Sequence, residues 1–431
     1  MRLIGLSINN YKSLKNVDFS PKNLSILVGP NAAGKSNFID ALDFLASIYR
    51  YGIENAISMK GGYENIAFRK HRRTKAPISF EVRFMLSRTE LNRLYARVMQ
   101  LKNIKRLPPQ DSSLTIVHSF SFKTKGSDIR SDFIIIDEKL EIKRKPSKNN
   151  TSRSSIFLIS RNHKGVIEPT YLENEIVSYY FRSRFDTDLP LRDFLLSSEQ
   201  SLFISHPVFF YALSLEKLSN IGTFRFSSHA CKQSGVPAPQ PFLSLYGDNL
   251  PAVLDWFKRK HKEQWGHILE PMIDILPDLE DITIDYTHTK RLGIYFKTKN
   301  LQRPWSVEEV SDGTLQALAI LTASVDPRFL IIAIEEVENS LHPWIISILM
   351  DRLRLISKNK LVIITTHSPI VIDKSNPDEL WIVFKVDGET NIKSLPCLEK
   401  NILNEWENGA YKLSSYLDGG LLPQAVPGGM L

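Results

Sequence analysis

The sequence predicts an α/β fold with a parallel sheet and a separate antiparallel sheet. Three continuous apolar runs of buried-strand length, at 328–334, 361–364 and 380–384, alternate with helical patterns in the last third of the chain. A fourth run, Leu24–Val28, enters a glycine-rich turn that a helical pattern follows. Strictly alternating apolar and polar residues, clearest at 78–85, predict the antiparallel sheet.

The glycine-rich turn reads Gly29-Pro30-Asn31-Ala32-Ala33-Gly34-Lys35-Ser36 and fits the phosphate-binding pattern G-x-x-x-x-G-K-[ST]. A helix is expected to begin near Lys35, because apolar residues from 38 to 49 recur at helical spacing. The N–H groups of such a loop and the helix dipole attract phosphate. Gly29 and Gly34 are expected to adopt backbone conformations closed to other residues. We expect Lys35 to reach the β- and γ-phosphates of a nucleotide and Ser36 to ligate Mg²⁺.

Polar side chains follow two of the apolar runs, at the strand ends where parallel sheets carry their chemistry. Glu335 and Glu336 come directly after the run at 328–334, and His367 follows the run at 361–364. Phosphoryl transfer needs positioned charge more than covalent help. We therefore assign Glu335 to Mg²⁺, and Glu336, for the attacking water, His367, for the γ-phosphate, and Lys35 to catalysis.

A further candidate lies upstream of the carboxylates, in Val-Ser-Asp-Gly-Thr at 310–314. It precedes a strong helical pattern at 315–322. Ser311 is expected to cap that helix, and Gly313 to permit the close approach of a phosphate.

The remaining patterns outline the chain's organisation. An antiparallel pair within 2–19 is expected to lead into the strand before the glycine-rich turn, and further strands are expected at 114–122, 133–142, 155–159, 282–286 and 292–296, with a short charged helix at 88–101. From about 170 to 275 the pattern is helical and aromatic. We expect a first lobe at 1–165 with the glycine-rich loop and the antiparallel sheet, a helical insert at 166–280 and a second lobe at 281–431.

Positive charge is concentrated in one segment. Residues 101–164 hold 14 Lys/Arg against 6 Asp/Glu, whereas the rest of the chain carries 41 of each sign. Such a cluster suits either a polyanion, most simply DNA or RNA, or a solvated surface. Cys231 and Cys397 are the only cysteines, which excludes a disulfide framework and favours a reducing cytoplasm. No apolar run of about 18 residues is present, so no membrane span is expected.

The four motifs together resemble the RecF/SMC-like branch of the ABC ATPases. They are GPNAAGKS at 29–36, VSDGT at 310–314, IAIEEVENSLHP at 332–343 and ITTHS at 364–368. INNYKSLKNVDF at 8–19 and YKLSSYLDGGLL at 411–422 add to the likeness, and the nearest pattern is that of prokaryotic AAA-type ATPases of the OLD and Septu (PtuA, retron-associated) kind. The first carboxylate, Glu335, is commonly Asp in related enzymes. The middle of the chain resembles the group only in outline, and no Q-loop is placed.

The resemblance implies an ABC-type ATPase head that dimerises face to face around two ATP and Mg²⁺. The phosphate loop, with Glu335, Glu336 and His367, would come from one chain, and Ser311 and Gly313 from the other. Residues 338–341 would form the D-loop at the dimer seam.

Three functions are open at this point. The first is a nucleotide-driven switch in prokaryotic phage defence that regulates a separate nuclease or effector, because only 63 residues follow Ser368 and no nuclease signature is found. The second is a RecF-like DNA repair ATPase. The third, a transporter ATPase, is disfavoured by the 275 residues between Ser36 and Ser311.

Overall fold

The chain is seen in a computed structural model. It describes residues 1–68, 76–87, 89, 90, 92, 96, 114–125, 133–144, 155–162, 167–171, 201, 215–299, 301–409, 412–418 and 422. Half of the basic segment at 101–164 and most of the helix expected at 88–101 therefore lie outside the described residues, as do 172–200 and 202–214 of the expected helical insert.

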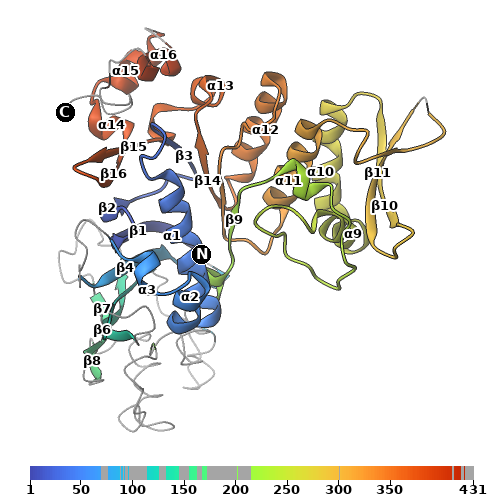
Figure 1. The fold of residues 1–431 in the computed structure, drawn as a ribbon. Helices are drawn as coiled ribbons and strands as arrows, with labels where there is room; N and C mark the ends of the chain where they lie inside the picture. The colour runs from blue at the N-terminus through green and yellow to red at the C-terminus, as the bar shows by residue number, and fades with distance from the viewer. Residues whose placement is uncertain are drawn as a thin grey trace. The chain divides into compact units, whose positions relative to one another are not determined.

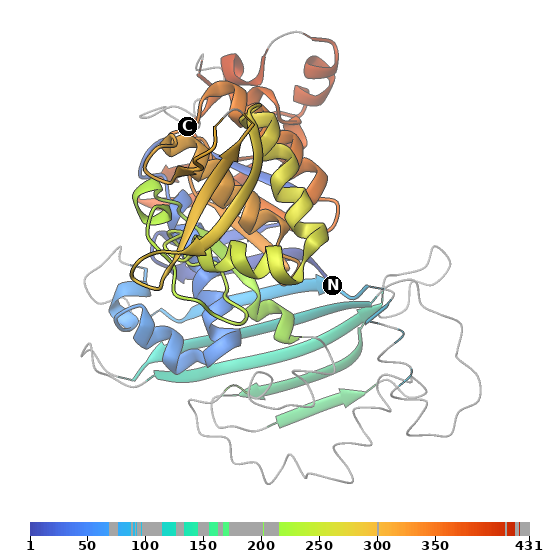
Figure 2. The same ribbon diagram turned by 90° about the vertical axis from the view of Figure 1, so that its right-hand side faces the viewer.

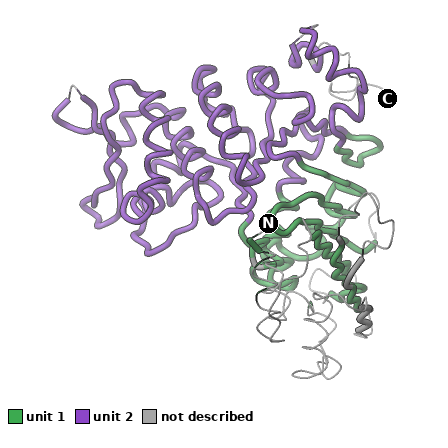
Figure 3. Tube along the Cα trace, turned by 180° about the vertical axis from the view of Figure 1, so that it is seen from behind, with its two compact units in different colours: residues 1–21, 40–220, 385–392 green, residues 22–39, 221–384, 393–431 purple. Residues whose placement is uncertain are grey.

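The chain divides into two compact units, each assembled from separate stretches of sequence (Figure 3). Unit 1 comprises residues 1–21, 40–220 and 385–392, and unit 2 comprises 22–39, 221–384 and 393–431. The two units do not follow the expected boundaries at residues 165 and 280. The division into two lobes and a helical insert stays a prediction. Every candidate site residue belongs to unit 2.

Unit 1 is built on the predicted antiparallel sheet (Figure 2). Its strand order is β2-β1-β4-β5-β6-β7-β8, and every neighbouring pair is antiparallel. The strands are β1 (Arg2–Tyr11), β2 (Leu14–Phe19), β4 (Ile78–Met85), β5 (Leu114–Thr124), β6 (Phe133–Arg144), β7 (Ser155–Asn162) and β8 (Ile167–Tyr171). Along β4 buried and half-buried residues alternate without exception. All the strands expected in this region are confirmed, most of them with a few additional residues.

One face of this sheet carries a buried aromatic layer. Phe80, Phe120 and Phe122 stack in sequence, with ring centroids 5.7 and 6.4 Å apart. The unit also holds α2 (Ile53–Met59), α3 (Tyr63–Ile66) and η1 (Leu215–Ser219), and α1 (Lys35–Tyr51) crosses from unit 2 into unit 1.

Unit 2 contains the predicted parallel sheet, apart from residues 385–392 at one edge, which count with unit 1. Its order is β16-β15-β3-β14-β13-β9, and the pairs β15–β3, β3–β14, β14–β13 and β13–β9 are parallel. The strands are β3 (Leu24–Val28), β9 (Ile221–Phe224), β13 (Ile331–Ile334), β14 (Leu361–Thr366), β15 (Leu380–Val386) and β16 (Glu389–Ser394). The parallel arrangement is confirmed. The helical prediction for 166–280 is wrong for β9, which is held in the sheet by its pairing with β13, and for β8, which pairs with β7 in unit 1.

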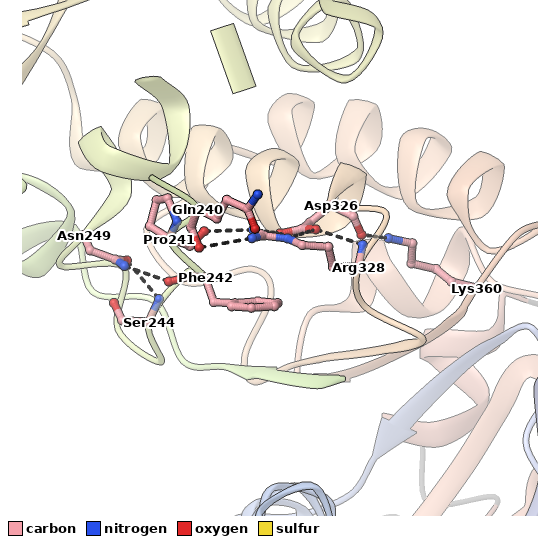
Figure 4. A network of polar contacts seen from close by, with 8 residues as sticks. All are labelled: Gln240, Pro241, Phe242, Ser244, Asn249, Asp326, Arg328 and Lys360. Carbon is pink, nitrogen blue, oxygen red and sulfur yellow. Dashed lines mark hydrogen bonds and ion pairs between the residues drawn. The ribbon is translucent and has the colours of Figure 1, made fainter. Parts of the chain in front are cut away.

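The strand expected at 328–334 begins three residues late, and side-chain chemistry explains the delay. Arg328 turns back to Asp326, with Nε 2.9 Å from Oδ1 and Nη2 2.6 Å from Oδ2 (Figure 4). Its Nη2 also donates to the Pro241 carbonyl, 2.8 Å away. The guanidinium lies 4.0 Å from the centroid of Phe242 and 3.9 Å from that of Trp256. These contacts make a turn at 326–328, so that β13 starts only at Ile331.

Unit 2 also contains a smaller β10–β11–β12 sheet and a set of helices. They are α8 (Ser228–Cys231), α9 (Leu250–Lys260), α10 (Lys262–Ile275), α11 (Asp312–Val325), α12 (Pro343–Ile356), α13 (Pro369–Asp373), η2 (Pro377–Glu379), α14 (Leu395–Leu398), α15 (Ile402–Glu407) and α16 (Leu413–Asp418). The small sheet comprises β10 (Leu279–Tyr286), β11 (Leu292–Thr298) and β12 (Trp305–Ser306).

Helix α11 is the central helix of this packing, and its residues from Gly313 to Ser324 are buried. Helix α10 contacts α11 on one side and β10 on the other (Figure 1). Among the described residues, no helix combines the length and the hydropathy that a membrane span needs.

Candidate functional site

The glycine-rich loop lies between a fully buried strand and a helix, as the sequence predicts. All five residues of β3 are buried, and α1 begins at Lys35. Gly34 has φ 115°, so the expectation of a conformation that favours glycine is confirmed there. Ala32 is also left-handed, with φ 60°. The loop thus turns sharply enough to direct its N–H groups inward at the start of the helix.

Gly29 is a glycine for a different reason from the one expected. It is absent from the residues with positive φ, so conformational freedom does not explain it. A Cβ atom at Gly29 would lie 1.9 Å from the carbonyl oxygen of Val383 in β15. The close approach of the neighbouring strand therefore excludes any side chain at this position.

Lys35 is buried and folds back over the loop. Its Nζ donates to the carbonyls of Gly29, at 2.7 Å, and Pro30, at 3.1 Å. Burial lowers the pKa of Lys35 to about 8, although the charges of Glu336, Glu338 and Glu335 act in the opposite direction. The ammonium group thus lies inside the loop, near enough to Glu335, Glu336 and Glu338 to interact with their charges.

Ser36 and Glu335 meet although they are far apart in the sequence. Ser36 Oγ donates to Glu335 Oε2 across 2.7 Å. One hydroxyl and one carboxylate oxygen are a donor set that fits Mg²⁺, which keeps most of its shell for water and phosphate oxygens. Among the described residues no cluster of three or more His, Cys, Asp or Glu side chains is arranged to hold a metal ion. The pair therefore fits a cation shared with a nucleotide better than one held by protein alone.

Glu336 lies where the chain leaves β13 in a strained conformation. Its φ is 48°, in the left-handed region that non-glycine residues seldom adopt. Its N–H donates to Thr365 Oγ1 at 2.9 Å, and its Oε2 accepts from Asn339 Nδ2 at 2.6 Å. These two contacts hold the carboxylate in a fixed direction at the carboxyl edge of the sheet.

His367 follows β14 and is exposed. Its main-chain N–H donates to Glu338 Oε1 across 2.5 Å. Burial and the nearby charge of Lys35 lower the pKa of His367, while the charges of Glu338 and Glu336 raise it less. The imidazole is therefore neutral near pH 7, and it lies close enough to Lys35 for their charges to interact.

Ser311 and Gly313 begin α11, as predicted. Ser311 caps the helix by accepting the N–H of Thr314 at 3.1 Å, and its side chain is exposed. Gly313 is buried, and a Cβ there would lie 2.5 Å from the carbonyl oxygen of Ser340. Within this chain the glycine therefore makes room for Ser340. Among the described residues no hydrogen bond or ion pair joins Ser311 to the phosphate loop or to the carboxylates.

The structure thus brings most of the predicted site residues together. Lys35 and Ser36 of the loop lie with Glu335, Glu336 and His367, whereas Ser311 is exposed at the start of α11 and Gly313 is buried behind it. Two contributors were not predicted in these roles: Thr365, which holds Glu336, and Glu338, which holds His367. The Thr-Thr-His sequence after a buried strand was the available signal for Thr365.

Comparison with known proteins gives the fold and the family. The structure is similar to the crystal structure of an SMC head bound to the C-winged helix domain of ScpA, with a TM-score of 0.51, 13% identity, and 93% of this chain and 99% of that chain covered. An SMC head from Pyrococcus furiosus with an extended coiled coil, bound to the C-terminal domain of ScpA, gives a TM-score of 0.47, 13% identity, and coverage of 94% and 99%. The first of these likenesses shows an SMC-head-like α/β fold, which confirms the predicted fold class.

Sequence similarity points the same way. Over 50 residues the chain is 40% identical to structural maintenance of chromosomes protein 1 of Saccharomyces cerevisiae, a match that spans 11% of this chain and 4% of that protein. The profile of the family described as "AAA domain, putative AbiEii toxin, Type IV TA system" matches residues 24–373, which include every candidate site residue. The chain belongs to this AAA family, and it is a P-loop ATPase with an SMC-head-like fold.

Proposed function

We propose that this ATPase is a dimeric switch: two chains close face to face around ATP, and hydrolysis reopens them. One observation carries the proposal. Lys35, Ser36, Glu335, Glu336 and His367 lie together, while the exposed cap of α11 makes its hydrogen bonds within its own helix. A phosphate loop and an exposed helix N-terminus can bind one nucleotide together when a second copy supplies the helix.

The residue roles follow from the contacts. Lys35 and the loop N–H groups would hold the β- and γ-phosphates, while Ser36 and Glu335 would hold Mg²⁺. Bound Mg²⁺ would offset negative charge on the phosphate oxygens. Glu336, fixed by Thr365 and Asn339, would orient and polarise the attacking water. His367 would contact the γ-phosphate as a neutral donor.

The partner's contribution would come from the start of α11. Ser311 and Gly313 of the second chain would approach the γ-phosphate with the helix N-terminus behind them. Asp312 is not expected to contact the phosphate, because its carboxylate pairs with Lys232 at 3.0 Å. Hydrogen bonds from Lys232 and Ser228 hold the pKa of Asp312 below its usual value. Ser311 is exposed while its hydroxyl is held by the Thr314 side chain and N–H, so the cap would face the partner in a fixed orientation.

The expected biological role is regulation of a separate effector in prokaryotic defence, in the manner of the OLD and Septu-type ATPases. Two findings about relatives support this. The family description names a toxin of a type IV toxin–antitoxin system, and the similar SMC head is bound, in its crystal structure, to a domain of another protein, ScpA. A head that changes state with ATP is suited to such control of a bound partner.

The decisive experiment uses Glu336→Gln. This change keeps the size and the Asn339 contact but removes the charge that activates water, so ATP should remain bound and the dimer should persist. Light scattering after gel filtration, with ATP and Mg²⁺, should give twice the monomer mass. The double variant Glu336→Gln/Ser311→Arg is the matched control and should stay monomeric. If Glu336→Gln is monomeric with saturating ATP, or hydrolyses ATP at the wild-type rate, the proposal is wrong.

A second candidate function is that of a RecF-like ATPase acting on DNA or RNA. It rests on the net charge of +8 within residues 101–164, half of which lie outside the described residues. If this segment contacts phosphates, nucleic-acid binding should weaken steeply with salt and should stimulate hydrolysis. Binding that is absent at low salt would leave the defence switch as the remaining candidate.

A further inference from the structure

Glu338 is a third carboxylate beside the site, and the roles proposed above do not use it. Its Oε1 accepts the main-chain N–H of His367 at 2.5 Å. Its Oε2 is buried and has no hydrogen-bond partner within the described part of the chain. Placing a charged oxygen in this way is costly unless the group is needed there, so Glu338 calls for a functional explanation.

The segment around Glu338 is fixed by two tight turns. Glu336 and Ser340 both have positive φ, 48° and 59°. The N–H of Asn339 donates to the Glu336 carbonyl at 3.0 Å, and that of Leu341 donates to the Glu338 carbonyl at 3.1 Å. With the backbone held on both sides, the direction of the Glu338 side chain is set by the course of the loop.

The same segment is also in contact with the start of α11. The Ser340 carbonyl lies against Gly313, where an added Cβ would be only 2.5 Å from the oxygen. With no room for even a methyl group between the two segments, a displacement of one is transmitted to the other. A continuous set of contacts therefore runs within one chain through Gly313, Ser340, Glu338 and His367. It connects the start of α11, proposed to meet the partner's nucleotide, with the histidine proposed to contact the chain's own nucleotide.

We propose that Glu338 is a positioning residue that holds His367 at the γ-phosphate and ties its placement to the Ser340–Gly313 contact. This inference rests on the function proposed above, since it assumes that His367 acts on nucleotide. Docking of a second chain on Ser311 and Gly313 would then bear on His367 through residues 338–340. The alternative is a structural role, in which Glu338 only stabilises the loop at 336–341.

The test is a double-mutant cycle in ATPase kinetics on the full chain. The variants are Glu338→Ala, which removes the acceptor, Glu338→Gln, whose amide oxygen can still accept the N–H, His367→Ala, and the pair Glu338→Ala/His367→Ala. Glu263→Ala, an exposed carboxylate at the start of α10, is the matched control. Thermal unfolding and the affinity for a fluorescent ATP analogue show whether each variant is folded and binds nucleotide.

We expect Glu338→Ala to lower kcat roughly tenfold or more, because a small misplacement of a catalytic group has effects of this order, while KM for ATP changes less than about twofold. Glu338→Gln should recover most of that loss. In the His367→Ala background, removing Glu338 should lower kcat by less than about twofold, since the group it positions is already gone. Glu263→Ala should match wild type.

The outcomes separate this inference from the function on which it rests. If His367→Ala keeps the wild-type rate, the role of His367 in the proposed function fails. If His367→Ala is slow but Glu338→Ala lowers the rate by the same factor in both backgrounds, only the positioning role is wrong. Equal impairment by Glu338→Gln and Glu338→Ala would also reject it. If Glu338→Ala does not fold, Glu338→Gln and Glu338→Gln/His367→Ala replace the two alanine variants in the cycle. A lowered kcat in folded Glu338→Gln then overturns the proposal.

Discussion

Ser36 Oγ donates a hydrogen bond to Glu335 Oε2 across 2.7 Å, although 299 residues separate them in the sequence. The contact joins the first turn of α1 to the end of β13. Strand β14 lies between β3 and β13 in the sheet, so the two residues reach each other across its carboxyl edge. Two oxygen donors brought together in this way define where a divalent cation would sit.

The first prediction concerns this pair. Ser36→Ala removes one oxygen donor and leaves Glu335 without its hydroxyl partner. We expect the gain in ATP affinity on adding Mg²⁺ to shrink by about tenfold, while affinity for ATP without metal changes little. A titration with a fluorescent ATP analogue, with Mg²⁺ and with EDTA, measures both. Ser347→Ala, in α12, is the control for loss of a hydroxyl elsewhere. If Mg²⁺ raises the ATP affinity of Ser36→Ala as much as that of wild type, Ser36 does not ligate the cation.

The second prediction is a pH dependence of nucleotide binding. Without nucleotide the pKa of Lys35 is about 8, so the amine is charged at pH 7 and largely neutral at pH 9. A bound phosphate favours the ammonium form and raises this pKa. Binding above pH 8 must therefore take up a proton, and affinity should fall by up to about tenfold per pH unit above that value.

Calorimetry in buffers of different ionisation enthalpy measures that proton uptake directly. His367→Ala should show the same pH dependence, because the pKa of His367 is already below its usual value and this group is neutral throughout the range. Lys35→Ala should lose most of the nucleotide affinity at every pH. Affinity that stays constant between pH 7 and 9.5 would show that Lys35 is not the cation that meets the phosphate.

The third prediction concerns the exposed cap of α11. Ser311→Arg places a long charged side chain on the surface proposed to meet the second chain. We expect kcat to fall about a hundredfold, comparable to loss of one transition-state donor, with ATP affinity per chain within about twofold of wild type. Mixing it with Lys35→Ala chains should restore partial hydrolysis, because one composite site then has an intact loop and an intact cap. Full activity of Ser311→Arg alone would exclude the composite site.

The sequence predicted the elements whose signal is local. Strand β3 was predicted to the residue and the start of α1 was expected near Lys35, because an apolar run, two glycines and helical spacing all occur within one stretch. Ser311 was recognised because an N-cap needs only its own helix. Buried parallel strands are also recognisable in the sequence, since both faces of the sheet are covered and the run of apolar residues is uninterrupted.

The elements that were missed depend on distant partners. Strand β9 reads Ile-Gly-Thr-Phe, too short and too mixed for a strand pattern, and it exists because β13 offers a free edge. The late start of β13 follows from the pairing of Arg328 with Asp326 and with two carbonyls near residue 240. The direction of the Glu338 side chain depends on two left-handed residues that are not glycines, which no propensity reveals.

The last prediction tests the steric reason for Gly29. In Gly29→Ala the new methyl group would meet the Val383 carbonyl at 1.9 Å, well inside any real contact, and the partner atom is backbone. Strand β15 or the loop must then move. We expect a loss of roughly 2–4 kcal/mol in the free energy of unfolding and loss of nucleotide binding, because overpacking against rigid backbone has effects of this size. Thermal unfolding and the fluorescent ATP titration measure the two effects.

Gly266→Ala provides the matched control. Gly266 is exposed in α10, has no positive φ, and an added Cβ would meet nothing within 4 Å. Alanine is favoured over glycine in a helix by about 1 kcal/mol, so this variant should be as stable as wild type or slightly more stable and should bind ATP normally. The same chemical change thus has opposite signs at the two sites. If Gly29→Ala unfolds at the wild-type temperature and binds ATP, the strand contact is not what requires glycine there.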